Sequence, residues 1–198
     1  WKLLPKRCTS FGQNISRLMV KSPKLWSPET PWLYSLVTKI HNGKKLIDET
    51  SQRLGIRTIS VDSEHGFRLN GVSRKFKGVC LHHDLGPFGA AINKAALIRQ
   101  VRILKEMGCD AIRTSHNIPS TMQMEVCDSM GMMVMAESFD MWEYPKCKNG
   151  YARFFNEWGE RDLTSLILNH RNHPSIVMWS IGNEIPEQND LKGGLGVS

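Results

Sequence analysis

Strand and helix patterns alternate from about residue 62 onward, and this alternation constrains the fold more than any other feature of the sequence. The spacing predicts strands over residues 75–81, 110–114, 132–136 and 175–181, separated by helices over residues 93–107, 119–130 and 157–170. Asn93 suits the N-cap of the first helix and Gly108 its end, while Pro119 and Gly131 mark the start and the end of the second. Short links between alternating strands and helices predict parallel βαβ units joined by right-handed crossovers.

The last two predicted strands indicate a sheet that is covered by helices. Both lack the two-residue alternation of a half-exposed strand, as buried parallel strands do. Four strands and three helices suit the first half of a (βα)₈ TIM barrel or a small doubly wound sheet. No Gly-x-Gly-x-x-Gly follows the first strand, which disfavours a nucleotide-binding sheet.

The first 61 residues have a different, all-β pattern. Residues 33–41 mix β-branched and aromatic side chains, and Asn42-Gly43 is a strong hairpin signal directly after them. Residues 45–50 and 56–61 are also strand-like, and three prolines between residues 23 and 31 disfavour a helix before them. We therefore expect two parts: residues 1–61 from a β-sandwich, and residues 62–198 from the N-terminal half of a barrel.

Composition narrows the function classes. A net charge of +7 and a pI near 9.3 would allow nucleic acid as a partner, but the basic residues are scattered and no nucleic-acid motif accompanies them. No stretch approaches the roughly 18 apolar residues of a membrane span, and no signal peptide is visible. The five cysteines are widely spaced without a Cys-x-x-Cys pair, which argues against a disulfide framework or a zinc site and favours free thiols. We expect no nucleic acid, membrane, metal or cofactor.

Polar residues follow every strand of the predicted barrel. The four strand ends read His82-His83-Asp84, Arg113 to Asn117, Glu137 to Asp140, and Asn183-Glu184. In a barrel, the carboxyl ends of the strands carry the chemistry. Burying such groups is costly unless they are paired, so a purely structural protein has little reason to collect them there. The sequence therefore predicts a functional rim.

Single residues on this rim have alternative roles. A partly desolvated Glu184 can serve as a general acid, or it can be a helix N-terminal carboxylate. Arg113 is expected to pair with a carboxylate beneath the site, and Glu137 or Asp140 could supply that carboxylate or reach substrate. Adjacent residues seldom converge on one ion, so we place no metal at His82, His83 and Asp84. His116 could equally be a core histidine, and Trp142 a sugar-stacking platform or a loop anchor.

The run from Arg171 to Glu184, RNHPSIVMWSIGNE, closely resembles the acid/base signature of glycoside hydrolase family 2. That family contains β-galactosidases, β-glucuronidases and β-mannosidases. Residues 25–34 resemble the lead into the last strands of its immunoglobulin-like sandwich, residues 70–82 its first barrel strand, and residues 111–117 its second-strand motif. The motifs occur in the family's order, and the resemblance extends to about Glu187.

The resemblance implies a retaining glycosidase that acts on β-linked oligosaccharides or glycosides. Residues 82–86 and 182–188 look most like bacterial β-galactosidases, with β-glucuronidases as the alternative. The resemblance assigns Glu184 as the acid/base, Asn183 to a contact with the sugar's 2-hydroxyl, and Arg113 to support of the nucleophile. We expect Glu137 to be a second supporting residue. The sugar subsite is expected to contain His82, Asp84, His116, Asn117 and Trp142. Magnesium-dependent members use Glu and His where this chain has Met141 and Glu143, so no metal site is carried over.

The resemblance also implies that this chain lacks the catalytic nucleophile. The family's nucleophile is a Glu on the seventh barrel strand, and no residue of this chain matches it. Two hypotheses follow: an internal part of a longer enzyme, or a catalytically inactive, sugar-binding fragment. The resemblance leaves open a homo-oligomeric parent and either the cytoplasm or the periplasm of a bacterium. Asn14-Ile15-Ser16 is a glycosylation sequon, and residues 192–198 are expected to form a loop.

Overall fold

The computed structural model describes residues 18–189 of the chain. Cys8, the sequon at residues 14–16 and the tail at 192–198 therefore lie outside the described residues. The described residues form three separate sheets and three α-helices. Two small antiparallel sheets come first along the chain, and the strands of the third sheet alternate with the helices. Among the helices of this part of the chain, none combines the length and the apolar character that crossing a membrane requires.

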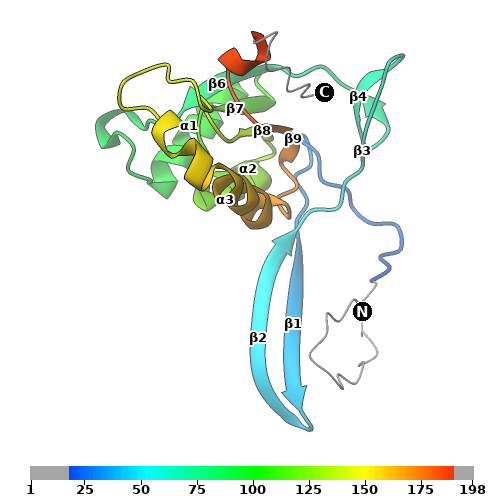
Figure 1. Ribbon diagram of the computed structural model, residues 1–198. Coiled ribbons are helices and arrows are strands. Elements are labelled where there is room, and N and C mark those ends of the chain that lie inside the picture. Colours follow the sequence, from blue (N-terminus) through cyan, green and yellow to red (C-terminus); the bar gives the residue numbers. More distant parts are fainter. Residues whose placement is uncertain (1–17, 190–198) are drawn as a thin grey trace.

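The first sheet is a long two-stranded hairpin. Strands β1 (Tyr34–Asn42) and β2 (Lys45–Leu54) pair antiparallel, so the predicted hairpin is confirmed. Its two-residue loop is Gly43-Lys44, one residue later than the predicted turn, with Gly43 at φ +59°. The hairpin projects away from the rest of the molecule (Figure 1), and nearly all its residues are exposed.

A second, small sheet has the order β3-β4-β5 and was not predicted as a unit. Its strands are β3 (Ile59–Asp62), β4 (Gly66–Leu69) and β5 (Val72–Ser73). Asn70 and Gly71 form the turn between β4 and β5, at φ +54° and +80°. The same Asn-Gly signal that marks the first hairpin was therefore present here as well. The expected strand over 56–61 starts three residues later and pairs with β4.

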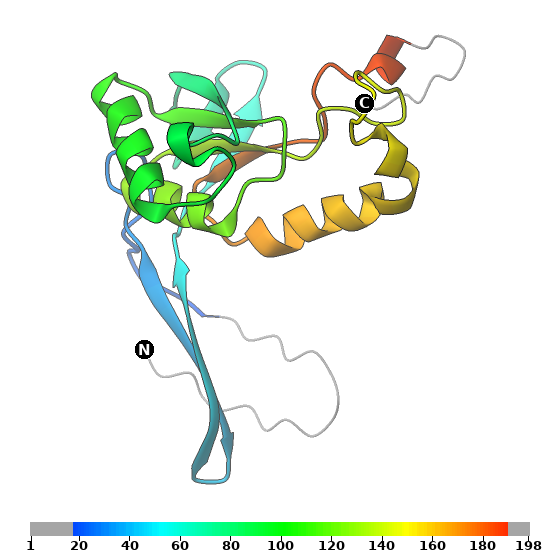
Figure 2. The same cartoon turned by 90° about the vertical axis from the view of Figure 1, so that its left-hand side faces the viewer.

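The third sheet confirms the predicted parallel βα pattern. Its strands lie in the order β6-β7-β8-β9 and are all parallel: β6 (Gly78–His82), β7 (Ala111–Ser115), β8 (Met133–Glu137) and β9 (Ile176–Ser180). Between them run α1 (Lys94–Glu106), α2 (Thr121–Met130) and the long α3 (Ala152–His170), which Figure 2 shows along one side of the molecule. Two short 3₁₀ helices, η1 (Gly86–Phe88) and η2 (Pro186–Asn189), follow β6 and β9.

Local capping explains most helix boundaries. The side chain of Asn93 accepts a hydrogen bond from the backbone N–H of Ala96, as predicted. Ser120 caps α2 in the same way through Gln123, so this helix begins at Thr121 and the predicted start at Pro119 was wrong. Gly131 ends α2 in the left-handed conformation, at φ +70°. Helix α3 begins five residues before its predicted start at residue 157.

The main core fills the space between the parallel sheet and its helices. Leu97 and Val101 of α1, Met124 of α2 and Leu166 of α3 pack there against buried strand residues such as Val134. A smaller core joins Trp26 and Leu69 to Ala111 and Met133 at the amino ends of the central strands. The other face of the sheet carries a hollow of about 230 Å³. Among the described residues, β6 and β9 are the edges of this sheet.

Candidate active site

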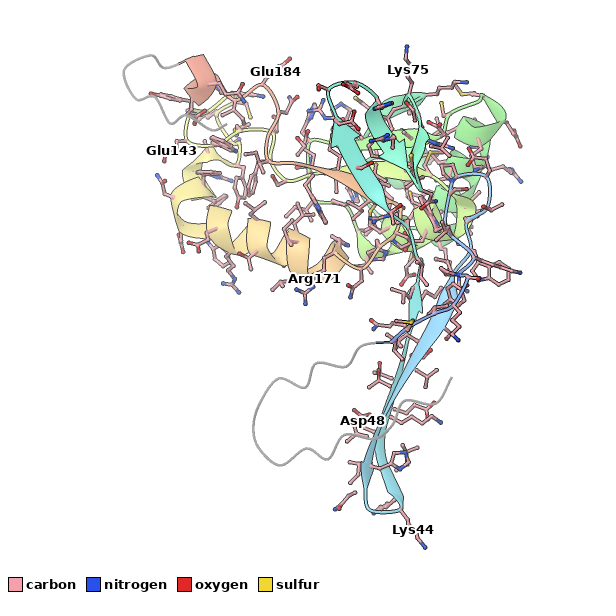
Figure 3. The ribbon with its side chains drawn as sticks, turned by 90° about the vertical axis from the view of Figure 1, so that its right-hand side faces the viewer. Lys44, Asp48, Lys75, Glu143, Arg171 and Glu184 are labelled. Carbon is pink, nitrogen blue, oxygen red and sulfur yellow. The ribbon has the colours of Figure 1, made fainter. Side chains whose placement is uncertain are left out.

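The carboxyl ends of the four parallel strands bring the predicted rim residues to one edge of the sheet. Figure 3 shows Glu184 on the loop beyond β9, and Arg171 at the opposite end of the βα layer. Glu143, on the loop after β8, lies at the same end as Glu184 (Figure 3). The predicted rim therefore exists as a spatial feature of the fold.

Glu137, the last residue of β8, is the centre of this edge and is fully buried. One of its oxygens accepts hydrogen bonds from Nε of Arg113 (2.7 Å) and from the hydroxyl of Ser180 (2.7 Å). The other lies 2.6 Å from Nδ1 of His116. Its backbone N–H donates to Oγ1 of Thr114. A buried carboxylate is tolerated because it is paired and hydrogen-bonded in this way, and the predicted pairing of Arg113 with a carboxylate beneath the site is present.

A chain of hydrogen bonds runs from Arg113 toward the loop that holds Glu184. Nη2 of Arg113 donates to Oδ1 of Asn183 (2.9 Å), and Nδ2 of Asn183 donates to Oδ1 of Asp140 (3.2 Å). Nζ of Lys146 donates both to Oδ1 of Asp140 (3.1 Å) and to the backbone carbonyl of Asn183 (2.6 Å). The side chain of Asn183 is therefore fixed at both ends, directly before Glu184.

These contacts shift the pKa of Arg113 and the pKa of Asp140. Burial alone would lower the pKa of Arg113, but the hydrogen bond and the charge of Glu137 raise it above its ordinary value. Burial would raise the pKa of Asp140, but hydrogen bonds from Asn183 and Lys146 hold it below its usual range. Both groups are therefore charged at neutral pH, and the edge contains alternating positive and negative charges.

A cavity of about 560 Å³ opens at the same edge. It is lined by His82 and His116, whose rings meet edge to face at a centroid distance of 5.1 Å, and by Asn117 and Asp140. Tyr151 and Asp162, from the region of α3, also line the cavity, and the hydroxyl of Tyr151 donates a 2.5 Å hydrogen bond to Asp162. The predicted subsite residues His82, His116 and Asn117 thus share one cavity.

Asp84 and His83, at the end of the first strand, make contacts within the following loop. Oδ1 of Asp84 accepts a hydrogen bond from the backbone N–H of Gly86 (2.6 Å), which shapes the turn into η1. His83 reaches the carbonyl of Ala90 (3.1 Å). Over residues 18–189, no three His, Cys, Asp or Glu side chains are grouped as metal ligands would be.

Glu184 itself is exposed and has a left-handed backbone, at φ +45°. Among the described residues it has no hydrogen-bond or ion-pair partner, so its carboxyl group is free to act on a ligand. The acidic residue in the first turn of the following η2 is Glu187. The alternative of a helix-terminal carboxylate therefore fits Glu187 better than Glu184.

Trp142 makes the contacts of a loop anchor. Its indole N–H donates to the carbonyl of Ile181 (2.9 Å), and its ring stacks on Phe155 at a centroid distance of 5.9 Å. Lys146, Ser180 and Glu187 escaped prediction as members of the site; the carboxylate of Glu187 accepts hydrogen bonds from the backbone N–H groups of Glu143 and Tyr144. Ser180 lies inside the signature run, but no local pattern distinguishes a lysine or a glutamate that bridges two loops.

Comparisons with known proteins bear on this arrangement. Residues 59–193 match the family model described as the TIM barrel domain of glycosyl hydrolases family 2, and residues 5–57 match a second model of that family. Over 87% of its length the chain is 54% identical to a β-galactosidase of Bacteroides ovatus and 34% identical to a β-glucuronidase of Bacteroides fragilis. It covers 20% and 25% of those two proteins.

A solved structure of a member of the same family is also similar to this chain. The crystal structure of a glycosyl hydrolase family 2 member from Bacteroides cellulosilyticus matches with a TM-score of 0.83 and 44% identity, over 87% of this chain and 22% of that one. In TIM barrels the active site lies at the carboxyl ends of the parallel strands, which is where this chain collects its polar side chains. The chain belongs to glycosyl hydrolases family 2.

Proposed function

We propose that this chain is the part of a longer retaining β-galactosidase that carries the acid/base, Glu184. The single observation that carries the proposal is the position of Glu184: unpaired, at the carboxyl edge of a parallel sheet, next to an Asn183 that is fixed at both ends of its amide. The 54% identity to a β-galactosidase supports the choice of sugar. The chain spans between a fifth and a quarter of the length of the two curated relatives compared above.

The proposal includes a finer reading of the fold. Residues 1–61 are the end of an immunoglobulin-like sandwich, and residues 62–198 are the first half of a (βα)₈ barrel. The two family segments meet between residues 57 and 59, which supports a boundary in this region. The exposed hairpin β1–β2 and the open edges of the parallel sheet are the surfaces that further strands would cover in such a protein.

In the proposed reaction Glu184 donates a proton to the glycosidic oxygen and later removes one from water. A second carboxylate, roughly 5 Å away in retaining enzymes, attacks the anomeric carbon. Asn183 can bond the sugar's 2-hydroxyl because its amide keeps one N–H and one lone pair beyond the bonds to Asp140 and Arg113. His82, Asp84, His116 and Asn117 contribute to the subsite of the cleaved sugar, and Trp142 borders it.

Glu137 is not a candidate for the nucleophile. It is fully buried, and both its oxygens already accept hydrogen bonds, from Arg113, Ser180 and His116. An attacking carboxylate needs an oxygen that can reach the anomeric carbon. We therefore place the nucleophile in a part of the enzyme outside this chain, and we propose that Arg113 supports it.

A panel of aryl glycosides tested on the full-length enzyme decides the sugar. We expect the β-galactoside to have the highest kcat/KM. The identity to a β-glucuronidase favours the glucuronide as the second candidate, and a preference for that substrate would replace the galactosidase assignment.

An assay of the purified 198-residue chain tests whether the nucleophile is absent. We expect no turnover of an aryl β-galactoside, as for a fragment that at most binds sugar. Turnover that disappears in Glu184→Gln would contradict this expectation, because it would require a nucleophile within the chain.

A further inference from the structure

The loop between β8 and α3, residues 138–151, holds the loop that contains Glu184 at several points. The backbone N–H of Asn183 donates to the carbonyl of Phe139 (3.0 Å), and the indole of Trp142 donates to the carbonyl of Ile181. In the opposite direction, a carboxylate oxygen of Glu187 accepts from the backbone N–H groups of Glu143 (2.7 Å) and Tyr144 (3.0 Å). The two loops therefore form one hydrogen-bonded unit.

Lys146 contacts the peptide group that directly precedes Glu184. Its ammonium group donates to the carbonyl oxygen of Asn183 at 2.6 Å, and that carbonyl belongs to the peptide group that joins Asn183 to Glu184. A second bond, to Oδ1 of Asp140 (3.1 Å), also holds the ammonium group. The side chain of Lys146 is 24% exposed. Its contacts therefore fix the plane of the peptide from which Glu184 extends.

The backbone of Glu184 needs such support. A residue other than glycine at φ +45° is in a sparsely populated conformation that persists only when its surroundings hold it. A change of this φ turns the Asn183–Glu184 peptide and the Glu184 side chain relative to each other. Lys146 opposes that rotation with a charge-assisted hydrogen bond, which is stronger than a neutral one.

We infer that Lys146 is a positioning residue for the acid/base: it holds the Asn183–Glu184 peptide so that the Glu184 carboxyl meets the glycosidic oxygen. The inference rests on the proposed function, because it assigns Lys146 a role only if Glu184 transfers the proton. Lys146 touches no reacting atom in this account. Its loss lowers the efficiency of proton donation and leaves the attack of the nucleophile unchanged.

Leaving-group dependence separates this role from a merely structural one. The full-length enzyme is assayed as wild type, Lys146→Met and Lys146→Gln on two aryl glycosides of the preferred sugar, with 2,4-dinitrophenol and with phenol as the leaving group. Dinitrophenolate departs with little help, whereas phenol needs the acid. General acid catalysis contributes about 10²–10⁴-fold, so for Lys146→Met we expect a loss of about 10–100-fold in kcat/KM on the phenyl glycoside. The loss on the dinitrophenyl glycoside is expected to stay below about threefold.

Lys148→Met is the matched control, because Lys148 is an exposed lysine of the same loop without a hydrogen bond or ion pair among the described residues. It should match wild type on both substrates. If Lys146→Met does not fold, Lys146→Gln, which keeps a donor and loses the charge, is judged by the same ratio. Equal losses on the two substrates, or no loss, would overturn the role of Lys146.

Glu184→Gln, measured on the same two substrates, distinguishes a failure of the inference about Lys146 from a failure of the proposed function. If Glu184→Gln loses activity mainly on the phenyl glycoside and Lys146→Met does not, only the inference about Lys146 fails. If Glu184→Gln itself shows no leaving-group dependence, the proposed function fails first.

Discussion

Replacing Glu137 with glutamine removes the fully buried negative charge beneath the site and keeps the size of the side chain. In the native structure this carboxylate is fully buried and accepts from Arg113, Ser180 and His116. Glutamine has one acceptor oxygen in place of two and no charge. Arg113 would then remain charged, with 28% of its side chain exposed and no anion against it.

The cost can be estimated from these contacts. Breaking a buried ion pair by removing one partner costs about 3–5 kcal/mol. Partial exposure of Arg113 lets water compensate in part, so we expect about 3 kcal/mol. In a folding unit of 150–250 residues each kcal/mol shifts the Tm by about 2–4 °C, which gives a decrease of about 6–12 °C.

Thermal unfolding of the full-length enzyme followed by calorimetry measures this shift in the transition of the barrel. Glu125→Gln is the matched control, because Glu125 is an exposed carboxylate on α2, and such surface changes stay within about 0.5 kcal/mol. In an Arg113→Met background the cost of Glu137→Gln should fall, because the two residues share one interaction. A Tm decrease no larger than that of the control would refute the reasoning that Glu137 is the paired buried charge of this edge.

Two further predictions concern stability. Gly131→Ala should lower the free energy of unfolding in urea by about 1–2 kcal/mol or more, because φ is +70° and the new Cβ would lie 2.4 Å from the carbonyl oxygen of Pro28. Gly43→Ala, at φ +59° with open space around it, should lower it less. Equal losses at the two positions would contradict the steric argument. Burial lowers the pKa of His170 below 6.5, and His173 makes a smaller contribution in the same direction. As the pH falls below about 6.5, His170 therefore becomes protonated in the unfolded chain while it stays neutral in the folded chain. Stability should therefore decrease between pH 6.5 and the lower folded pKa, and His170→Asn should flatten that decrease; an unchanged pH slope would contradict the assignment.

The parallel βα part of the fold was predictable because its signals are local. Apolar strands, the Asn93 cap and the Gly131 stop are each visible within a few residues, and the structure places them as expected. Boundaries were missed where a neighbouring residue competes: Ser120, and not Pro119, precedes α2 as its N-cap, because its hydroxyl accepts a hydrogen bond from the backbone N–H of Gln123. The small β3–β5 sheet was missed although Asn70-Gly71 marks its turn, because its strands have only two to four residues.

The site was predictable as far as the parallel sheet determines it. Strand ends of a parallel sheet meet at one edge, so the pairing of Arg113 with a carboxylate could be expected from order along the chain alone. Lys146 and Glu187 could not, because each bridges two loops through backbone groups, and such bonds depend on loop conformation and not on residue type. Trp142 illustrates the same limit: its sequence position allowed a sugar platform or an anchor, and its bond to Ile181 favours the anchor.

The central claim is that Glu184 transfers the proton, and chemical rescue of Glu184→Ala tests it most directly. With a dinitrophenyl β-galactoside, formation of the glycosyl-enzyme needs little acid catalysis, while the attack of water on that intermediate needs the base. Azide needs no base, so added azide should restore turnover of Glu184→Ala in the full-length enzyme and yield the β-galactosyl azide. A variant that keeps activity within about tenfold of wild type without azide would contradict the assignment, since acid/base catalysis contributes about 10²–10⁴-fold.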